Sequence, residues 1–268
     1  MKLEEFNYDL PKELIAQEPA EPRDSCRLMM VDKKTGEWEH HHFRDILDEI
    51  REGDVFVFNN TKVIPARLYG KKRDTGGKVE MLLLTPKGND TWEVLVNPGR
   101  KALPGVEIEF AENCYCKVLD KTEFGGRLVE FHYDGNFDSL LDQIGEMPTP
   151  PYIHKKLGNN DEYQTVYAKY KGSAAAPTAG LHFTPELMEE MKKKGAKLLF
   201  VTLHVGIGTF RPVSEENIED HEMHKEWYTV SEETAKEVNA ARAEGRRVIA
   251  VGTTSVRTLE SAGQSGIL

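Results

Sequence analysis

Four histidines in the second half of the chain could transfer protons near neutral pH. His182 ends an uncharged loop, His204 directly follows an apolar run, and His221 and His224 are three residues apart. Histidine has an ordinary pKa close to neutrality, so each of the four is a candidate general acid or base. On a helix, His221 and His224 would share a face and could bind a metal ion, but no third ligand stands at a telling spacing. We therefore expect no metal site, and a solvated or catalytic pair is the favoured interpretation.

The loop at residues 172–183 is built almost entirely from small residues and carries no charge before its histidine. Pro177 restricts its backbone, and Gly180 permits an unusual turn. This composition predicts neither a helix nor a strand. Such a loop lets the backbone approach a ligand closely, although a loop that is only well packed between two domains can have the same composition. Composition leaves both interpretations open.

Two further segments rich in glycine and polar residues could bind an anion. Residues 203–212 and residues 252–260 both leave the ends of apolar runs. In open α/β sheets, ligands bind at the carboxyl ends of the strands. A helix that begins at residues 253–255 would offer free N–H groups to a carboxylate or phosphate, and Arg257 could add a charge-assisted hydrogen bond. The alternative is an ordinary helix cap followed by a surface arginine.

The common signatures of nucleotide and hydrolase sites are absent from the sequence. Gly206 and Gly208 form only G-x-G, with Arg211 in the third position, which excludes the dinucleotide fingerprint. Neither the phosphate-binding G-x-x-x-x-G-K-[ST] nor the nucleophile motif G-x-S-x-G occurs. Cys26 lies among charged residues that could activate a thiol, but a structural cysteine is the favoured interpretation.

Bulk composition limits the possible partners. The 268 residues carry a net charge of -10 and include no apolar stretch near the roughly 20 residues that span a bilayer. The N-terminus lacks the apolar core of a signal peptide, so we expect a cytoplasmic protein with no membrane association. The negative charge argues against indiscriminate nucleic-acid binding and leaves room for a local basic surface at residues 71–73 and 155–156.

Two kinds of sequence pattern divide the chain. An apolar run at residues 54–58 lies in the first half of the chain. In the second half, apolar runs at residues 198–201 and 248–251 alternate with helical patterns, which predicts an α/β domain with a mostly parallel sheet. Between residues 66 and 133, six short apolar or alternating runs are separated by glycine and proline turns, which indicates a small antiparallel barrel or sandwich. A short helical pattern at residues 137–144 and a proline-rich crossing follow.

Several long motifs together carry a family resemblance. They are GSAAAPTAGLHFT at 172–184, TLHVGIGTFRP at 202–212, VGTTSVRTLE at 251–260 and YQTVY at 163–167. NNT at 59–61, PARL at 65–68, and MP with PPYI at 147–148 and 150–153 fit as well, in the same order. In these motifs the chain resembles the S-adenosylmethionine:tRNA ribosyltransferase-isomerases of queuosine biosynthesis.

The resemblance implies a fold and a reaction. The fold is an α/β domain with a mostly parallel sheet and an inserted small antiparallel β-barrel domain; we place the α/β domain at residues 1–61 and 148–268 and the barrel at residues 62–147. The reaction transfers and isomerises the ribosyl moiety of S-adenosylmethionine onto 7-aminomethyl-7-deazaguanine at the tRNA wobble position, giving epoxyqueuosine-tRNA, adenine and methionine. It implies no metal and no cofactor beyond S-adenosylmethionine as co-substrate. We expect a monomer that binds the tRNA anticodon loop.

The chain departs from the family pattern at three places. Cys26 stands where the family usually has serine, and Lys62 where it usually has arginine. Family members also continue beyond the position of Leu268 with a segment that contains an Asn-Phe-His-Leu-Pro motif, so we expect a C-terminal truncation. A non-catalytic tRNA-binding fragment is therefore the alternative function, and an unrelated small-molecule enzyme on the same scaffold is a third.

The implied reaction assigns roles to the candidate residues. The sulfonium acidifies the neighbouring ribose carbon, so a base can remove its proton, and we expect this base to be His182 or His204, with His221 and His224 as further candidates. Departing adenine needs a hydrogen-bond donor, and the methionine carboxylate needs a helix start or an arginine. The expected substrate-binding residues are Asn59, Asn60, Thr61, Arg67, Thr178, Gly180, Gly206, Gly208, Thr209, Arg211, Thr253, Thr254, Ser255 and Arg257.

Overall fold

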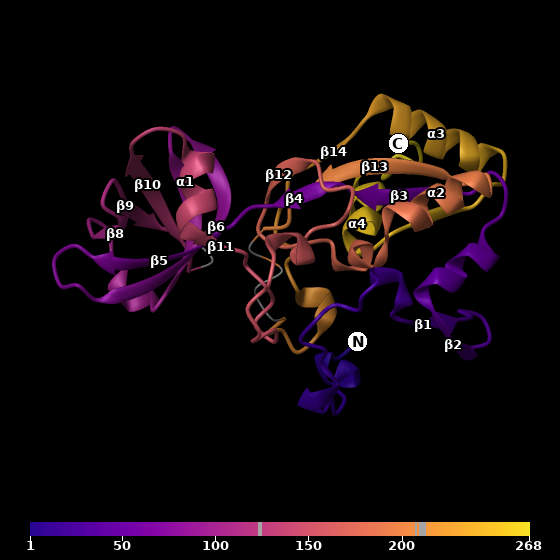
Figure 1. The fold of residues 1–268 in the computed structure, drawn as a ribbon, viewed down its shortest axis with the longest axis horizontal. Coiled ribbons are helices and arrows are strands. Elements are labelled where there is room, and N and C mark those ends of the chain that lie inside the picture. Colours follow the sequence, from indigo (N-terminus) through magenta and orange to yellow (C-terminus); the bar gives the residue numbers. More distant parts are fainter. Residues whose placement is uncertain (123–124, 207, 209–212) are drawn as a thin grey trace.

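The polypeptide folds into a parallel-sheet unit and a β-barrel, which lie at opposite ends of the molecule (Figure 1). The structure is a computed structural model that describes residues 1–122, 125–206, 208 and 213–268. Among these residues, no helix is long and apolar enough to cross a membrane.

The parallel-sheet unit is built on a four-stranded sheet in the order β14-β13-β3-β15. The strands are β3 (Val55–Asn59), β13 (Lys197–Leu203), β14 (Tyr228–Val230) and β15 (Val248–Ala250). β3 pairs in parallel with β13 and with β15, and only β14 runs antiparallel to its neighbour β13. The prediction of a mostly parallel sheet is therefore confirmed. Every residue of β3 is buried, because this strand lies between two others and both of its faces are covered.

Helices cover both faces of this sheet. α2 (Pro185–Lys193) packs on the face that carries Phe56 and Phe58, while α3 (Glu232–Ala243) packs on the face that carries Val55 and Val57. Alternate residues of one strand point to opposite faces, which explains this division. Thr184 Oγ1 caps the start of α2 by accepting a hydrogen bond from the backbone of Leu187 at 3.1 Å.

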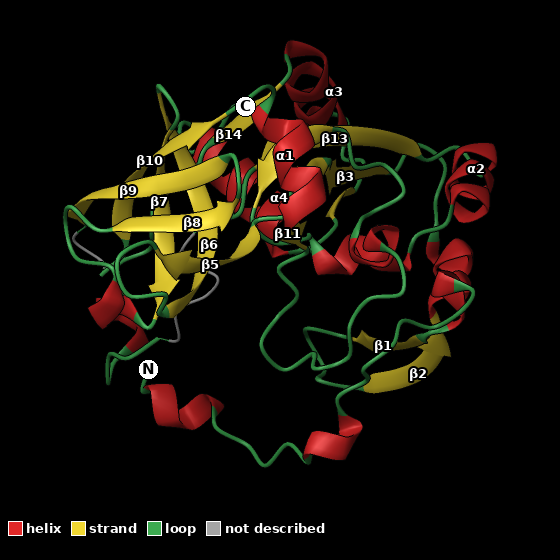
Figure 2. Ribbon diagram, turned by 60° about the vertical axis from the view of Figure 1, so that its left-hand side comes forward, coloured by secondary structure: helices red, strands yellow, loops and turns green. Residues whose placement is uncertain are grey.

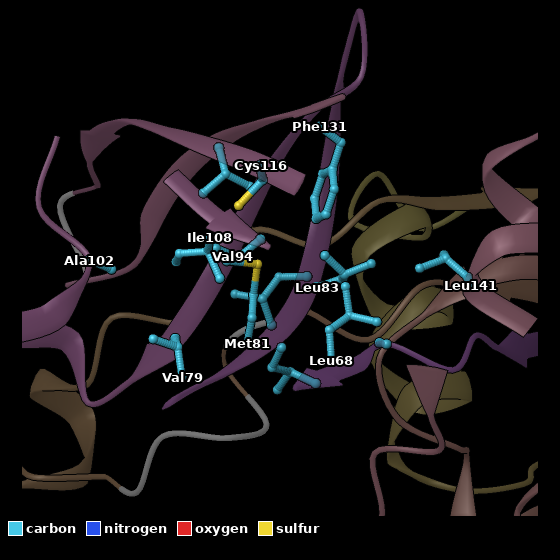
Figure 3. Packing of buried hydrophobic residues seen from close by; sticks show 14 of the residues in the cluster. Leu68, Val79, Met81, Leu83, Val94, Ala102, Ile108, Cys116, Phe131 and Leu141 are labelled. Atoms are coloured by element: carbon cyan, nitrogen blue, oxygen red, sulfur yellow. The ribbon is translucent and has the colours of Figure 1, made fainter. Parts of the chain in front are cut away.

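The barrel closes on itself. Its strands are β5 (Arg67–Lys72), β6 (Lys78–Gly88), β7 (Thr91–Asn97), β10 (Arg127–Tyr133), β9 (Cys114–Lys121) and β8 (Glu107–Ala111), in that spatial order, and β5 pairs with β8 to complete the circle. A short strand, β11 (Gly145–Glu146), adds to β5, and α1 (Phe137–Ile144) lies beside it. All six predicted strands are present, so the predicted antiparallel β-barrel is confirmed. Met81, Leu83 and Phe131 project into its interior (Figure 3).

A connecting region joins the two units. β4 (Thr61–Val63) pairs in parallel with β12 (Tyr170–Ser173), directly after β3 ends. The loop that was predicted to hold neither helix nor strand therefore begins inside a strand, and it continues into the 3-10 helix η7 (Thr178–His182). The predicted domain limits at residues 62 and 147 stay a prediction. The strands of the barrel run from Arg67 to Glu146.

The N-terminal region forms a small hairpin and several short helical turns. β1 (Arg27–Val31) and β2 (Trp38–His42) make the hairpin, which lies apart from the barrel (Figure 2). The helical spacing at residues 43–50 forms the 3-10 helix η4 (Phe43–Glu49). The remaining short turns are η1 (Leu3–Phe6), η2 (Lys12–Leu14), η3 (Arg23–Ser25), η5 (Gly99–Lys101), η6 (Asn160–Tyr163) and η9 (Ile218–Asp220).

Candidate active site

Two cavities lie on either side of the chain directly after β13. Two adjacent residues line them, one residue in each cavity. Val205 lines a cavity of about 670 Å³, and His204 lines a second of about 1010 Å³. The smaller cavity lies at the carboxyl end of β13, whereas the larger one extends along β13 from Leu198 to His204. The carboxyl ends of β3 and β13 face the barrel (Figure 1). This is the edge of an open α/β sheet at which ligands bind. Described residues of the loops at 172–183, 203–212 and 252–260 meet here, because Thr178, Val205 and Gly252 line the same cavity.

The smaller cavity, here called the small-residue cavity, is formed mainly by backbone and short side chains. No described residue of its lining is charged. Its walls come from the 172–183 loop, the residue after His204, the start of α4 (Thr253–Ala262) and the proline-rich crossing. The lining residues are Pro150, Pro151, Tyr152, Tyr163, Ala175, Ala176, Pro177, Thr178, Ala179, Val205, Gly252, Thr253 and Thr254.

The start of α4 offers hydrogen-bond donors to this cavity. Gly252, the residue before the helix, has a φ of +83°, and no side chain of the described residues caps the helix there. A Cβ at this glycine would lie 3.2 Å from the Ala179 Cβ, so glycine allows the two loops to touch. The hydroxyls of Thr254 and Ser255 are buried and find no hydrogen-bond partner among the described residues. A buried unsatisfied hydroxyl costs roughly 1–3 kcal/mol, which a bound ligand would offset.

Buried polar side chains fix the ends of the strands around the cavities. Asn59 accepts a hydrogen bond from the Leu203 amide and donates one to the Leu203 carbonyl, both at 3.0 Å. The Ser173 hydroxyl accepts from the Val205 amide at 3.0 Å and donates to the Ala175 carbonyl at 2.7 Å. Asn59, which was predicted to bind substrate, is fully buried and uses its side-chain amide to join β3 to β13.

His204 projects into the larger cavity and is held on three sides. Its Nδ1 lies 2.7 Å from the Thr61 hydroxyl, and its ring stacks on Trp227 with centroids 5.0 Å apart and planes inclined by 17°. Its Nε2 faces Gly172, where an added Cβ would lie only 2.9 Å away. Burial lowers the pKa of His204, so the imidazole is neutral at pH 7 and able to accept a proton.

His182 occupies a different environment from His204. Its Nδ1 lies 3.2 Å from the Cys26 thiol, and its ring centroid is 5.2 Å from that of Phe43. Burial lowers the pKa of His182, and the Arg23 guanidinium lowers it further. As far as the described residues show, His182 lines neither cavity, so the structure does not bring the two favoured histidines together.

The other two histidines belong to the segment that follows the 203–212 loop. His221 Nδ1 lies 2.9 Å from a Glu215 carboxylate oxygen, and this contact is the main reason that the pKa of Glu215 falls to about 2. The carbonyl of His224 accepts a hydrogen bond from the Arg257 guanidinium, and its side chain packs against Gly208. The structure thus places these histidines in loop contacts.

Arg257 forms an ion pair within the protein. Its guanidinium contacts the Glu226 carboxylate, whose other oxygen accepts a hydrogen bond from the Gly206 amide at 2.8 Å. The Glu226 side chain is only 6% exposed. Arg257 was predicted to bind a substrate carboxylate directly. This role stays a prediction, and in the structure Arg257 connects α4 to the loop after β13 through Glu226.

The remaining predicted binding residues are divided between the two cavities and their supports. Thr178, Thr253 and Thr254 line the small-residue cavity, and Asn60 lines the larger one. Gly180 is buried against the Tyr167 hydroxyl. Arg67 forms an ion pair with Glu80 at 3.1 Å, Ser255 is buried at the start of α4, and Thr209 and Arg211 lie outside the described residues.

The predicted basic surface is largely paired with carboxylates. Lys72 contacts Asp74 at 3.4 Å and Arg73 contacts Glu107 at 2.9 Å. Lys155 forms an ion pair with Glu18, and Lys156 lies 3.6 Å from Glu146. Pairing reduces the positive potential that these residues offer to a phosphate backbone.

Sequence reasoning missed three residues that shape the site. Trp227 stacks on His204, Glu226 joins two loops, and Ser173 fixes the loop beside Val205. Trp227 and Glu226 precede a three-residue edge strand, and such a short element has no periodicity that would mark it. A tryptophan three residues after His224 was the one available signal in the sequence.

Comparison with known proteins identifies the family. The model of the family described as "Queuosine biosynthesis protein" matches residues 3–266. A relative from Thermoanaerobacter sp. (strain X514) is 58% identical over 262 residues, which is 97% of this chain and 77% of the relative. A relative from Caldanaerobacter subterraneus subsp. tengcongensis is 57% identical over 270 residues, which is 100% of this chain and 79% of the relative. Both are named S-adenosylmethionine:tRNA ribosyltransferase-isomerase.

A solved structure is also similar. It is the S-adenosylmethionine tRNA ribosyltransferase from Thermotoga maritima, which is 38% identical, with a TM-score of 0.46 and coverage of 97% of this chain and 73% of that chain. The family match and the relatives agree with the motifs at 172–184, 202–212 and 251–260. The chain therefore belongs to the queuosine biosynthesis family of S-adenosylmethionine:tRNA ribosyltransferase-isomerases.

Proposed function

We propose that this chain transfers and isomerises the ribosyl moiety of S-adenosylmethionine onto 7-aminomethyl-7-deazaguanine at the wobble position of tRNA. The products are epoxyqueuosine-tRNA, adenine and methionine. The observation that carries the proposal is the pair of cavities on either side of residues 204 and 205, one for each substrate of a two-substrate transfer. Membership of a family whose relatives are named for this reaction supports it.

S-adenosylmethionine is assigned to the small-residue cavity. Its volume of about 670 Å³ is within the range of roughly 300–1,000 Å³ typical of small-molecule sites. Short side chains in the 172–183 loop allow an adenosyl group to lie against backbone. The start of α4 offers its free N–H groups and the Thr254 hydroxyl to the methionine carboxylate. The Thr178 hydroxyl is placed to donate to the departing adenine.

His204 is the proposed general base. It must be neutral to accept the proton from the ribose carbon next to the sulfonium, and burial lowers its pKa in the required direction. If Nδ1–H donates to the Thr61 hydroxyl, Nε2 carries the lone pair, and the absence of a side chain at Gly172 leaves room for the imidazole itself. Thr61 is then a positioning residue that selects the tautomer.

His182 is the second candidate base and is assigned a supporting role at the end of η7. Its ring lies between Cys26 and Phe43 and anchors the loop that lines the small-residue cavity. His221 and His224 are assigned to the contacts that hold the segment leading to Glu226. The proposed enzyme uses no cofactor beyond S-adenosylmethionine, binds the tRNA anticodon loop, acts as a monomer and works in the cytoplasm.

Adenine release tests the function directly. The purified protein is incubated with S-adenosylmethionine and a tRNA that carries 7-aminomethyl-7-deazaguanine, and adenine is quantified by chromatography. We expect release with this tRNA and none with a matched tRNA that carries guanine at the wobble position. RNA binding without adenine release would instead establish a tRNA-binding protein without this catalytic activity. Neither binding nor release would overturn both assignments.

A further inference from the structure

The larger cavity, here called the aromatic groove, differs in chemistry from an ordinary small-molecule pocket. Its volume is about 1010 Å³, and it combines aromatic, basic and hydroxyl side chains. The lining residues are Asn60, Tyr167, Lys169, Tyr170, Lys171, Leu198, Leu199, Phe200, Thr202, His204, Trp227, Thr229, Ser231, Glu233 and Thr234. Most of them come from β12, β13, β14 and the start of α3, while Asn60, Tyr167, Lys169, His204, Trp227 and Ser231 lie in the connections between elements.

Trp227 presents a large flat surface to solvent. One face of its ring stacks on His204 at 5.0 Å, and the residue is nevertheless 59% exposed. The stack fixes the orientation of the indole, and the backbone of Trp227 is fixed too, because its carbonyl accepts a hydrogen bond from the His204 amide at 3.0 Å. A pre-oriented aromatic ring with an open face is suited to stacking a planar ligand.

Cationic side chains lie beside a second exposed aromatic ring in the same groove. The Lys169 ammonium is 5.0 Å from the centre of the Tyr170 ring, and Tyr170 is 48% exposed. Lys171 lies one residue further along β12, directly opposite Lys62 of β4 in the parallel register. Lys171 contacts Asp138 at 3.4 Å, and Glu233 contributes one carboxylate to the lining. Basic side chains therefore gather along the β12 side of the groove.

We infer that the aromatic groove holds the unpaired anticodon-loop segment of the tRNA substrate, with one extruded base stacked on the open face of Trp227 and the adjoining phosphates near Lys169 and Lys171. This inference rests on the proposed function, which requires a wobble base to leave its stack and meet S-adenosylmethionine. Aromatic platforms beside basic side chains are how proteins bind single-stranded RNA, since every base has a face to stack.

The position of the groove makes the inference specific. The base that stacks on Trp227 lies next to His204, whose backbone neighbour Val205 lines the small-residue cavity. The groove and the small-residue cavity therefore adjoin at residues 204 and 205, where the ribose of S-adenosylmethionine must extend out of its cavity to reach His204 and the nucleobase. Of the barrel residues that were predicted to bind RNA, Lys72 and Arg73 are paired with carboxylates, whereas Trp227 and Tyr170 are open to solvent. The groove is therefore the better candidate for sequence-tolerant RNA contacts.

Substitution of Trp227 tests the inference against a matched control. Trp38 on β2 is also 59% exposed, and it belongs to the N-terminal hairpin. We expect W227A to weaken binding of an anticodon stem-loop that carries 7-aminomethyl-7-deazaguanine by about tenfold or more, as loss of one base stack does, and W38A to leave it unchanged. W227F, which keeps a ring, should restore most of the affinity. Binding is measured by fluorescence anisotropy with labelled stem-loop.

A charge reversal provides a second arm if W227A fails to fold. K169E should weaken stem-loop binding and reduce its salt dependence, while K71E on the barrel should do neither. Binding of S-adenosylmethionine alone, measured by calorimetry, should be unchanged in both variants. Unchanged stem-loop affinity in W227A, W227F and K169E, with adenine release intact, would overturn the groove assignment and leave the proposed function standing. A wild-type protein that neither binds the stem-loop nor releases adenine would overturn both.

Discussion

The two cavities that adjoin at residues 204 and 205 differ in the kinds of residue that line them. The small-residue cavity is lined by backbone, alanines and a helix start, and none of its described lining residues is charged. The aromatic groove is lined by two lysines, a histidine and several aromatic rings. Backbone surfaces recognise one ligand by close fit, whereas side-chain platforms accept a larger and more variable ligand. Under the proposed assignments, a small nucleoside and an RNA loop would be bound side by side without shared lining residues.

The largest expected effect comes from replacing His204, which lies where the two cavities adjoin. Replacement of His204 by alanine removes the proposed base and the partner of Trp227, so kcat should fall roughly 100-fold or more. S-adenosylmethionine binding should fall much less than kcat, because His204 is proposed to contact only the reacting ribose and does not line the small-residue cavity in the part of the chain that the structure describes. Single-turnover adenine release and calorimetry measure the two quantities. H182A is the matched comparison, and a larger loss of kcat in H182A than in H204A would reverse the assignment of the base.

A substitution in the small-residue cavity should weaken the binding of S-adenosylmethionine and leave the binding of the stem-loop unchanged. Ala179 lies opposite Gly252, and leucine at this position would fill space that the adenosyl group needs. We expect A179L to raise the Kd for S-adenosylmethionine by roughly tenfold or more, because excess volume at a close-fitting site is poorly accommodated. Stem-loop affinity should stay within about twofold of wild type. Equal losses for both ligands would show that the two cavities are not independent sites.

A smaller effect is expected from the residue that orients His204. T61V keeps the shape of the side chain but removes the hydroxyl that lies 2.7 Å from Nδ1. Since a typical hydrogen bond contributes about 1 kcal/mol, kcat should fall by roughly fivefold to tenfold with little change in KM. T61S restores the hydroxyl and should restore kcat. A change confined to KM would indicate that Thr61 contacts substrate.

The pH dependence should show the smallest effect near neutrality. Burial lowers the pKa of His204 below its ordinary value of 6.5, so the acid limb of the kcat profile should lie below pH 6.5. Between that lowered pKa and 6.5, the unfolded chain binds more protons at this position than the folded chain does. The free energy of unfolding should therefore decrease as the pH falls through this window. Kinetic profiles and urea titrations from pH 5 to 8 check both points, and an acid limb above pH 6.5 would contradict the assignment.

The barrel was the part of the fold that the sequence predicted most completely. Its six strands carry alternating apolar residues and are separated by glycine and proline turns, which are local signals. β12 and β14 were not predicted, because each is only three or four residues long and depends on pairing with a distant segment. The 172–183 loop was predicted to be irregular because its strand residues also depend on pairing with a distant segment. Its first residues become a strand only when they lie beside β4.

The candidate site could be located from sequence but not resolved into contacts. The rule that ligands bind at the carboxyl ends of parallel strands was enough to select the loops at 203–212 and 252–260. It could not show that Arg257 would pair with Glu226, 31 residues away, or that His182 would lie beside Cys26, 156 residues away. Such pairs form because the chain brings distant segments together, and residue type alone does not reveal them. His204 could be selected from the sequence because it directly follows the apolar run that forms β13, and such a run is a local signal.

The division of His204 and Val205 between two cavities also limits how the chain can change length. Neighbouring side chains of an extended segment point in opposite directions, so the side chain in each cavity depends on whether its distance from the end of β13 is odd or even. Inserting one residue directly after Leu203 would place the new residue beside Trp227 and turn the histidine toward the small-residue cavity, whereas deleting His204 would place Val205 beside Trp227. A substitution in this segment therefore changes one side chain in one cavity, whereas a single-residue insertion or deletion should change the side chains that line both cavities.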